Sequence, residues 1–205
     1  SRRRRRFTGR CREAVSAKDS GMKKRTRIHI GGLHASREPA IIETVLGSCV
    51  AVCLFDPVER IGGMNHILLP GRADLSNFDS VSRYGINAME LLINRIMALG
   101  STRGPLVAKI FGGAHMLSSF SRQNGMGLRN AAFVLDFLQM ESIRVVGQDL
   151  GGYDTRRISF HTDTGEVLLK RIPPLSSPRI DLEERKYLNQ VRREARNSGD
   201  FVLFV

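Results

Sequence analysis

Two apolar stretches on either side of a short turn constrain the fold of this chain more than any other feature. Residues 49–55 and 62–69 contain residues that favour strands, and Asp56-Pro57 between them is a typical turn sequence. The two stretches are therefore predicted to form an antiparallel hairpin centred within this turn. Pairing about that centre places Cys49 directly opposite His66, so that the two side chains share one face with Cβ atoms about 4.5–5.5 Å apart.

A cysteine and a histidine at that separation can form a thiolate–imidazolium pair. A free thiol has a pKa of about 8.5, and a neighbouring imidazolium lowers it. The histidine can then protonate a leaving group. Gly47-Ser48 favours a tight backbone bend that would direct the amides of Ser48 and Cys49 toward a developing oxyanion. The Ser48 hydroxyl itself is predicted to point away from Cys49.

A structural role is the alternative for Cys49, because free cysteine is among the most buried residue types. Cys53 has no Gly-Ser before it and is predicted to be such a core residue. A metal site is not indicated, because two residues four apart on a strand lie about 13 Å apart and cannot share one ion. No metal or cofactor is expected, and the remaining histidines, His29 among them, are assigned no role.

These residues resemble the signature of CheD, the family of chemoreceptor glutamine deamidases. The shared elements are a Leu-Gly-Ser-Cys-Val turn, an Asp-Pro turn and a Gly-Gly-x-x-His segment that ends in Leu-Pro, with matching Cys-to-His spacing. Further similar motifs follow at residues 109–114, 127–130, 149–152, 156–158 and 160. The resemblance extends over roughly residues 26–172. It implies that Cys49 is the nucleophile and His66 its partner.

The family carries a third catalytic residue, a threonine six positions before the cysteine. Glu43 occupies that position here, and Thr44 lies one position closer. Successive residues of a strand point to opposite faces, so Thr44 would reach the site only through a β-bulge. Otherwise another group would orient His66. Thr44 is the third candidate residue, and Glu43 is assigned no role.

Composition places these motifs in one domain of ordinary size. The chain has 205 residues, three cysteines without a disulfide-like spacing, and no apolar stretch near the ~18 residues of a membrane span. Residues 1–25 contribute +9 of the net charge of +12. They are predicted to form a disordered basic tail, so the charge does not indicate nucleic-acid binding by the folded part. The tail is either a solubilising leader or a segment attracted weakly to an anionic membrane or receptor surface.

The pattern of apolar residues predicts an α+β fold. Apolar residues at helical spacing predict helices at residues 79–99, 130–140 and 181–197. Short apolar runs predict further strands around residues 28–30, 41–42, 106–111, 143–148, 157–162 and 166–171. Regular βαβ alternation is missing, which favours a single domain of mixed β-sheet layers with helices packed on one side. The family resemblance implies the same architecture.

Three parts of the chain are expected. Residues 1–25 are the basic tail, residues 26–172 the catalytic domain, and residues 173–205 a C-terminal helix followed by an apolar tail.

Two glycine pairs, Gly112-Gly113 and Gly151-Gly152, follow predicted strands. Neither continues into a phosphate-binding G-x-x-x-x-G-K-[ST] loop, so a nucleotide site is not indicated. They are interpreted as loops that a substrate backbone approaches closely, with plain tight turns as the alternative.

The resemblance implies a cofactor-independent amidohydrolase that converts glutamine to glutamate in the cytoplasmic helices of chemoreceptors. Cys49 would form a γ-glutamyl thioester, and His66 would protonate the departing ammonia and then activate water. The protein would act in the cytoplasm at receptor arrays. A non-catalytic adaptor that binds receptors or the CheC phosphatase is the alternative, and a protease or methylesterase would share the nucleophile. The intact Cys49/His66 pair favours an enzyme.

Overall fold

The computed structural model describes residues 23–71, 73, 75, 79–115, 125–173 and 178–197. Within these residues the chain forms nine strands and three helices in one α+β domain. The strands are β1 (Lys24–Arg27), β2 (Leu33–Ser36), β3 (Ala40–Leu46), β4 (Val50–Asp56), β5 (Ile61–Ile67), β6 (Val107–Gly112), β7 (Arg144–Leu150), β8 (Thr155–His161) and β9 (Val167–Ile172). The helices are α1 (Ser80–Met97), α2 (Met126–Met140) and α3 (Pro178–Asn197). Most of the predicted basic tail and the apolar C-terminal tail lie outside the described residues.

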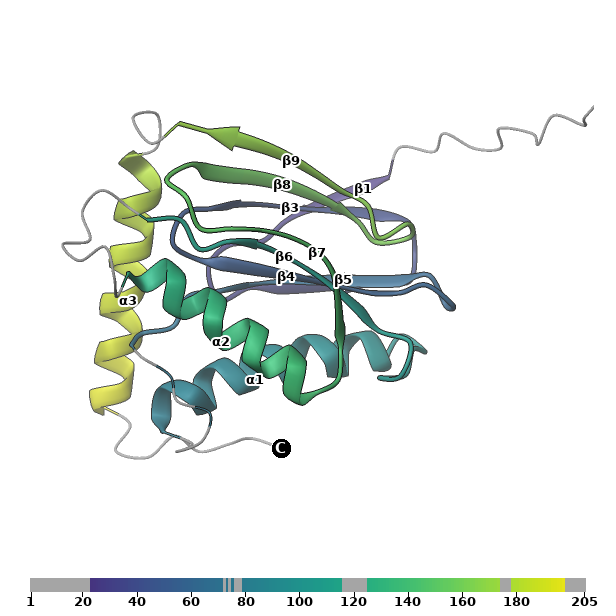
Figure 1. Cartoon of the computed structure of the whole chain (residues 1–205), viewed down its shortest axis with the longest axis horizontal. Coiled ribbons are helices and arrows are strands. Elements are labelled where there is room, and N and C mark those ends of the chain that lie inside the picture. The colour runs from purple at the N-terminus through teal and green to yellow at the C-terminus, as the bar shows by residue number, and fades with distance from the viewer. Residues whose placement is uncertain are drawn as a thin grey trace, which may run out of the picture.

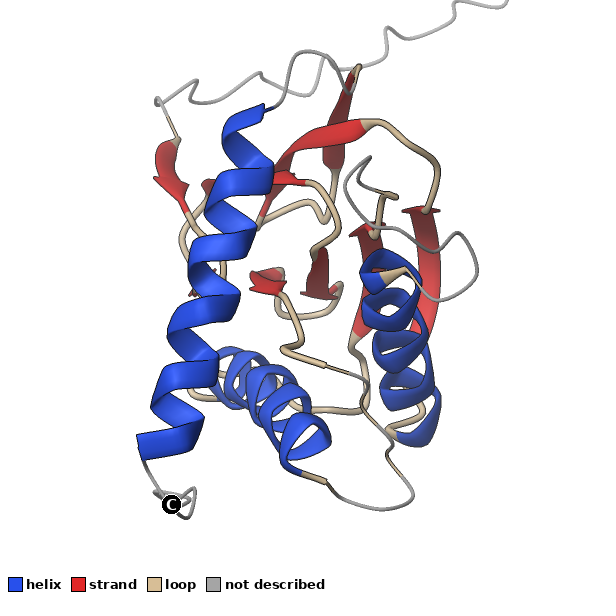
Figure 2. Cartoon of the chain, turned by 90° about the vertical axis from the view of Figure 1, so that its left-hand side faces the viewer, coloured by secondary structure: helices blue, strands red, loops and turns tan. Residues whose placement is uncertain are grey.

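Two sheets lie face to face, and two helices cover one of them (Figure 1). The four-stranded sheet has the order β1-β3-β8-β9, and the five-stranded sheet has the order β2-β5-β4-β6-β7. Pairs β1–β3 and β6–β7 are parallel, whereas the other pairs are antiparallel. Helices α1 and α2 lie along the outer face of the five-stranded sheet, and α3 crosses one end of the layers (Figures 1 and 2). The predicted mixed sheets with helices on one side are confirmed.

Hydrophobic side chains fill the spaces on both sides of the five-stranded sheet. One cluster lies between the two sheets, and the other lies between the five-stranded sheet and helices α1 and α2. Strands β4 and β5 are therefore buried on both faces. This position explains why their sequences are continuous apolar runs, without the alternation of a half-exposed strand. None of the described helices is both long and apolar enough to span a membrane.

The β4–β5 hairpin is present, but its register differs from the predicted one. Ala51 lies opposite His66, so the prediction that Cys49 does so is wrong. The Asp56 carboxylate accepts hydrogen bonds from two amides of the turn (2.8 and 3.1 Å), and the chain reverses over residues 57–60, so the centre of the hairpin lies one residue further along the chain than predicted. A shift by two residues keeps Cys49 on the same face as His66. Such diagonal neighbours have Cα atoms roughly 7–8 Å apart.

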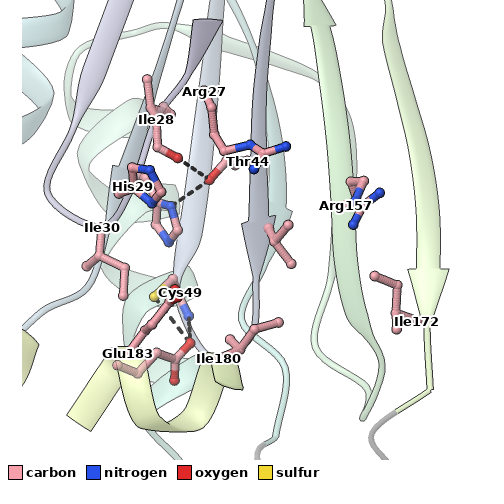
Figure 3. A pocket seen from close by; sticks show the side chains of 13 residues that line it. Arg27, Ile28, His29, Ile30, Thr44, Cys49, Arg157, Ile172, Ile180 and Glu183 are labelled. Atoms are coloured by element: carbon pink, nitrogen blue, oxygen red, sulfur yellow. Dashed lines mark hydrogen bonds between the residues drawn. The ribbon is translucent and has the colours of Figure 1, made fainter. Parts of the chain in front are cut away.

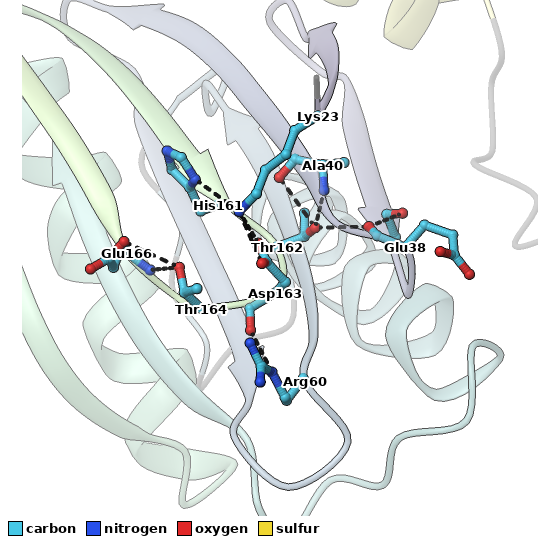
Figure 4. Close-up of polar contacts among 10 residues, drawn as sticks. Lys23, Glu38, Ala40, Arg60, His161, Thr162, Asp163, Thr164 and Glu166 are labelled. Carbon is cyan, nitrogen blue, oxygen red and sulfur yellow. Dashed lines mark hydrogen bonds and ion pairs between the residues drawn. The ribbon is translucent and has the colours of Figure 1, made fainter. Parts of the chain in front are cut away.

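The end of the sheets away from α3 is held by polar contacts between turns (Figure 4). Lys23 Nζ contacts both carboxylate oxygens of Asp163 in the β8–β9 turn (2.7 and 2.9 Å). Arg60, at the end of the β4–β5 turn, donates from Nε to the Asp163 carbonyl oxygen (3.1 Å). These contacts tie the two sheets to the beginning of β1. Strand β1 spans the predicted boundary at residue 26, and the division of the chain into three parts stays a prediction.

Several local predictions differ from the structure. Ile28 and Ile30, predicted as strand residues, lie in the loop between β1 and β2. Helix α2 begins at Met126, four residues before the predicted start. Ala132 of α2 and Leu91 of α1 are exposed although both are apolar, because their neighbours on each helix contact the five-stranded sheet instead.

Candidate active site

The chain crosses from the four-stranded to the five-stranded sheet through residues 47–49. The carbonyl oxygens of residues 47, 48 and 49 accept hydrogen bonds from Ala114 N (2.8 Å), Asn130 Nδ2 (2.9 Å) and Gly113 N (2.7 Å), respectively. The N–H and C=O groups of a trans peptide unit point in opposite directions. These bonds therefore turn the amides of Ser48 and Cys49 toward the other side of the turn, where both can reach the same acceptor.

Gly112 and Gly113 lie directly against this turn. Both have positive φ (113° and 66°), and a Cβ on Gly112 would lie 2.2 Å from the Cys49 carbonyl oxygen. A side chain here would displace Cys49. Gly151 and Gly152, with φ of 74° and 69°, form the adjoining loop, and Gly151 N donates to Gly112 O (3.0 Å). The glycine pairs support the turn from behind; their contact with a substrate stays a prediction.

His66, near the end of β5, is held in one tautomer by Thr44. Thr44 Oγ1 donates its proton to the carbonyl oxygen of Ile28 (2.9 Å), so it accepts a hydrogen bond from His66 Nδ1 (2.8 Å; Figure 3). This pattern assigns the imidazole proton to Nδ1 and a lone pair to Nε2. His66 Nε2 is buried and has no hydrogen-bond partner within the described part of the chain. Nε2 is therefore the ring nitrogen whose lone pair faces no other group of the described chain.

The loop between β1 and β2 surrounds His66. Gly31 N donates to the His66 carbonyl oxygen (2.8 Å), and His66 N donates to Gly32 O (3.0 Å). His29 of the same loop lines the cavity in front of His66 (Figure 3). Burial, with a contribution from His29, lowers the pKa of His66 to about 3. His66 is therefore neutral near pH 7 in this structure.

Thr44 reaches the site without the predicted β-bulge. The β3–β8 register is regular through Thr44. Thr44 lies on β3 in the four-stranded sheet, whereas Cys49 lies in the turn that crosses to the five-stranded sheet, so alternation along β3 does not determine the face on which Cys49 lies. Glu43 faces the other side of β3, where its carboxylate accepts hydrogen bonds from Arg25 (2.7 Å) and Ser159 (3.2 Å).

A carboxylate from α3 accepts hydrogen bonds from the backbone amides of Ser48 and Cys49. Glu184 Oε1 accepts hydrogen bonds from Ser48 N (2.8 Å), Cys49 N (3.3 Å) and Cys49 Sγ (3.3 Å), and Oε2 accepts one from Ser48 Oγ (2.6 Å). The prediction that the Ser48 hydroxyl points away from Cys49 is wrong, since both side chains contact the same carboxylate. Ile180 and Glu183 of α3 line the same cavity as Cys49 (Figure 3).

The Cys49 thiol is protonated in this arrangement. Cys49 is 1% exposed, and burial together with the Glu184 carboxylate raises the pKa of its thiol well above the usual range. Since His66 is also uncharged, the predicted thiolate–imidazolium pair does not form in this state. Cys53 packs between the two sheets, as predicted, and burial also raises the pKa of its thiol.

A cavity of about 410 Å³ lies in front of these groups. Thr44, Cys49 and His66 line it from the sheets, and α3 closes another wall. Arg27 and Arg157 add positive charge to its rim (Figure 3). Among the residues that the structure describes, no three His, Cys, Asp or Glu side chains are grouped as a metal site would require.

A buried thiol, an imidazole with a free nitrogen and two convergent amides are typical of the class of cysteine-dependent acyl-transfer sites. The family model for CheD chemotactic sensory transduction matches residues 68–171 of this chain. The chain is also similar to the "Probable chemoreceptor glutamine deamidase CheD 1" of Shewanella oneidensis, with 46% identity over 176 residues that cover 85% of this chain and 84% of that protein.

Two further relatives carry the name "Probable chemoreceptor glutamine deamidase CheD". The relative from Vibrio vulnificus strain CMCP6 is 39% identical over 182 residues, which cover 85% of this chain and 84% of that protein. The relative from Thiobacillus denitrificans is 44% identical over 164 residues, which cover 79% of this chain and 81% of that protein. This protein belongs to the CheD family. The family-model match begins just after His66, so the roles of the site residues stay predictions.

The roles of three residues at the site were not predicted from the sequence. Asn130 lay in a motif that supported the resemblance, but its role in holding the Ser48 carbonyl was not foreseen. His29 was assigned no role, because only the fold brings its loop to His66. Glu184 did leave a signal, because it falls on the same helical face as Leu188 and Val191, and a charged residue on an apolar face indicates a specific contact.

Proposed function

We propose that this protein converts glutamine side chains of chemoreceptors to glutamate, with Cys49 as nucleophile and His66 as general acid and base. Family membership and the names of the relatives support the reaction and the substrate class. One observation carries the assignment of residues: the Thr44–His66 hydrogen bond leaves the buried His66 Nε2 unpaired, and His66 and Cys49 line the same cavity.

In the proposed reaction the Cys49 thiol gives its proton to His66 Nε2, and Sγ attacks the carboxamide carbon. The amides of Ser48 and Cys49 stabilise the negative oxygen of the tetrahedral intermediate. His66 then protonates the amide nitrogen, ammonia leaves, and a γ-glutamyl thioester remains. A water molecule deprotonated by His66 hydrolyses the thioester, which releases glutamate and restores the thiol.

Thr44 acts in this proposal as a positioning residue. Its hydroxyl keeps the imidazole proton on Nδ1, so that Nε2 is the nitrogen available for proton transfer. The Ile28 carbonyl in turn fixes the direction of the Thr44 hydroxyl. The reaction uses only these groups and water and requires no cofactor.

The proposed substrates are the cytoplasmic helices of chemoreceptors, so the protein would act in the cytoplasm at receptor arrays. Arg27 and Arg157 at the rim of the cavity would favour an acidic partner surface. Binding to the CheC phosphatase, and weak attraction of residues 1–25 to an anionic membrane surface, belong to the same proposal.

A non-catalytic adaptor that binds receptors or CheC is the second candidate function. The occupied site favours the adaptor, because the Glu184 carboxylate accepts the hydrogen bonds of the Ser48 and Cys49 amides and the Cys49 thiol is protonated. An adaptor, however, would not need the Thr44 hydroxyl to select a tautomer of His66.

Ammonia release from a purified chemoreceptor cytoplasmic fragment, with mass spectrometry of its glutamines, separates the two candidates. We expect wild type to add about 1 Da at each converted site and Cys49→Ala to add none. Cys53→Ala is the matched control and should retain the activity. A folded wild type that binds the fragment but releases no ammonia would support the adaptor, and methanol release from a methylated fragment would reveal an esterase.

A further inference from the structure

Glu184 occupies the part of the site where the reacting group of a substrate would lie. Its Oε1 is within hydrogen-bond distance of Ser48 N, Cys49 N and Cys49 Sγ, and the residue is 4% exposed. Two amides and the nucleophile that converge on one oxygen mark the position of the oxygen that becomes negative during acyl transfer. A glutamine from another molecule cannot reach these donors while Glu184 is bound.

The chemical identity of this side chain matches the product of the proposed reaction. Hydrolysis replaces the NH₂ of a glutamine carboxamide by OH and leaves a glutamate side chain. We propose that α3 is a tethered product analogue, whose Glu184 must withdraw from the amides of Ser48 and Cys49 before a substrate glutamine can enter. This inference rests on the proposed function, because only a deamidase has glutamate as its product.

A narrow apolar stripe docks α3 on the domain. Tyr187, Leu188 and Val191 follow Glu184 at the spacing of one helical face. Leu188 and Val191 are buried, and Leu188 belongs to the cluster between the two sheets. The Tyr187 hydroxyl contacts the Tyr84 hydroxyl of α1. This stripe places Glu184 over the turn that carries Cys49.

The docked helix has the features of an element that can leave. Leu182 at its beginning is 53% exposed, and the charged residues Glu183, Arg185 and Lys186 are exposed as well. None of the ion pairs in the described structure involves Glu184, so hydrogen bonds alone offset the burial of its carboxylate. Burial raises the pKa of this carboxyl group accordingly. Elements with few buried apolar contacts open at a lower free energy than the whole domain.

An occupant tethered in this way acts as an intramolecular competitive inhibitor. The apparent affinity for substrate falls in proportion to the fraction of molecules in which α3 has withdrawn. Saturating substrate overcomes the competition. Removal of the Glu184 carboxylate should therefore lower KM and leave kcat nearly unchanged, whereas removal of a catalytic group would lower kcat.

The test measures two quantities in the full chain: alkylation of Cys49 by iodoacetamide, and deamidation kinetics on the chemoreceptor fragment. Glu184→Ala removes the carboxylate, and Leu188→Asp disrupts the docking stripe while leaving Glu184 in the chain. Asn189→Ala, on the exposed face of α3, is the matched control. Peptide mass spectrometry separates Cys49 from Cys53, whose alkylation would report unfolding of the domain.

We expect Cys49 alkylation to rise about tenfold or more in Glu184→Ala and Leu188→Asp and to stay unchanged in Asn189→Ala, with KM lowered several-fold in Glu184→Ala. Unchanged alkylation and KM in both variants, or a loss of kcat in Glu184→Ala, would overturn the inference. If alkylation rises but no form, wild type included, converts a receptor glutamine, the proposed function fails. The product analogy then fails with it, although α3 still covers Cys49.

Discussion

Two different kinds of structure bring polar groups to Cys49. On one side, the sheet-held side, Thr44 and His66 lie on β3 and β5, and the backbone hydrogen bonds of both sheets fix their positions. On the other side, the helix-held side, Glu184 comes from α3. This helix crosses the end of the sheets (Figure 2) and joins the core through a narrow apolar stripe. The groups that every turnover would need are thus part of the core, whereas the group that fills the site belongs to a helix with few buried apolar residues.

The two buried cysteines test whether the sheet-held side is a catalytic site. Cys49 and Cys53 are each 1% exposed, so replacement of either by alanine should lower the free energy of unfolding by about 1 kcal/mol. Only Cys49→Ala should abolish deamidation of the receptor fragment. Urea unfolding and ammonia release measure the two effects. Deamidation by Cys49→Ala, or its loss in a folded Cys53→Ala, would contradict a catalytic role for Cys49 and a purely structural role for Cys53.

A glutamine at position 184 would turn the helix-held side into a substrate. In Glu184→Gln the same helix would carry a carboxamide to Cys49, and we expect its hydrolysis with a mass gain of about 1 Da on the α3 peptide. The double variant Glu184→Gln, Cys49→Ala should show no gain. Persistence of the introduced glutamine in a preparation that converts receptor glutamines would contradict the product-like position of Glu184.

The sequence predicted the sheet-held side better than the helix-held side, for physical reasons. Continuous apolar strands around Asp56-Pro57 determine the hairpin and the shared face of Cys49 and His66. The register was missed because it depends on how the Asp56 side chain bonds the turn amides. A β-bulge was expected to be necessary for Thr44 to reach the site, because the prediction treated the chain up to Cys49 as one strand, although it changes sheets at residues 47–49.

Contacts between distant segments could not be predicted in this way. Glu184 meets Ser48 across 136 positions, and Asn130 meets it across 82 positions. Local periodicity gives the face of α3 but not the surface on which it docks. The fold class followed from the pattern of elements, whereas the occupant of the site depended on tertiary packing.

Removal of the Thr44 hydroxyl should weaken the sheet-held side without destroying it. Thr44→Val leaves His66 Nδ1–H and the Ile28 carbonyl without their partner, so the imidazole no longer favours one tautomer. We expect kcat to fall about 10- to 100-fold, less than loss of the acid–base group itself would cause. Thr44→Ser retains the hydroxyl and is the matched control. Equal kcat values for the two variants would exclude a positioning role.

The free energy of unfolding at acidic pH depends on the burial of His66. Its pKa is about 3 in the folded protein against 6.5 for an ordinary histidine, so below pH 6.5 the unfolded chain binds more protons. Stability should therefore fall as pH falls, by up to about 1.4 kcal/mol per pH unit from this group. The raised pKa of Glu184 acts in the opposite direction but is shared by wild type and His66→Gln. Urea unfolding at pH 7 and 5 should show a smaller loss in His66→Gln; equal losses would contradict a buried neutral imidazole.

The smallest effect is expected one residue away from Thr44. The Glu43 carboxylate pairs with Arg25, whose side chain is 61% exposed, on the face of β3 that points away from Cys49. Glu43→Ala should therefore lower the free energy of unfolding by less than about 1 kcal/mol and leave kcat and KM unchanged. Glu43→Thr, which restores the residue that the family resemblance implies, should likewise leave kcat and KM unchanged. A gain of activity in Glu43→Thr would show that position 43 reaches the site and would transfer the positioning role away from Thr44.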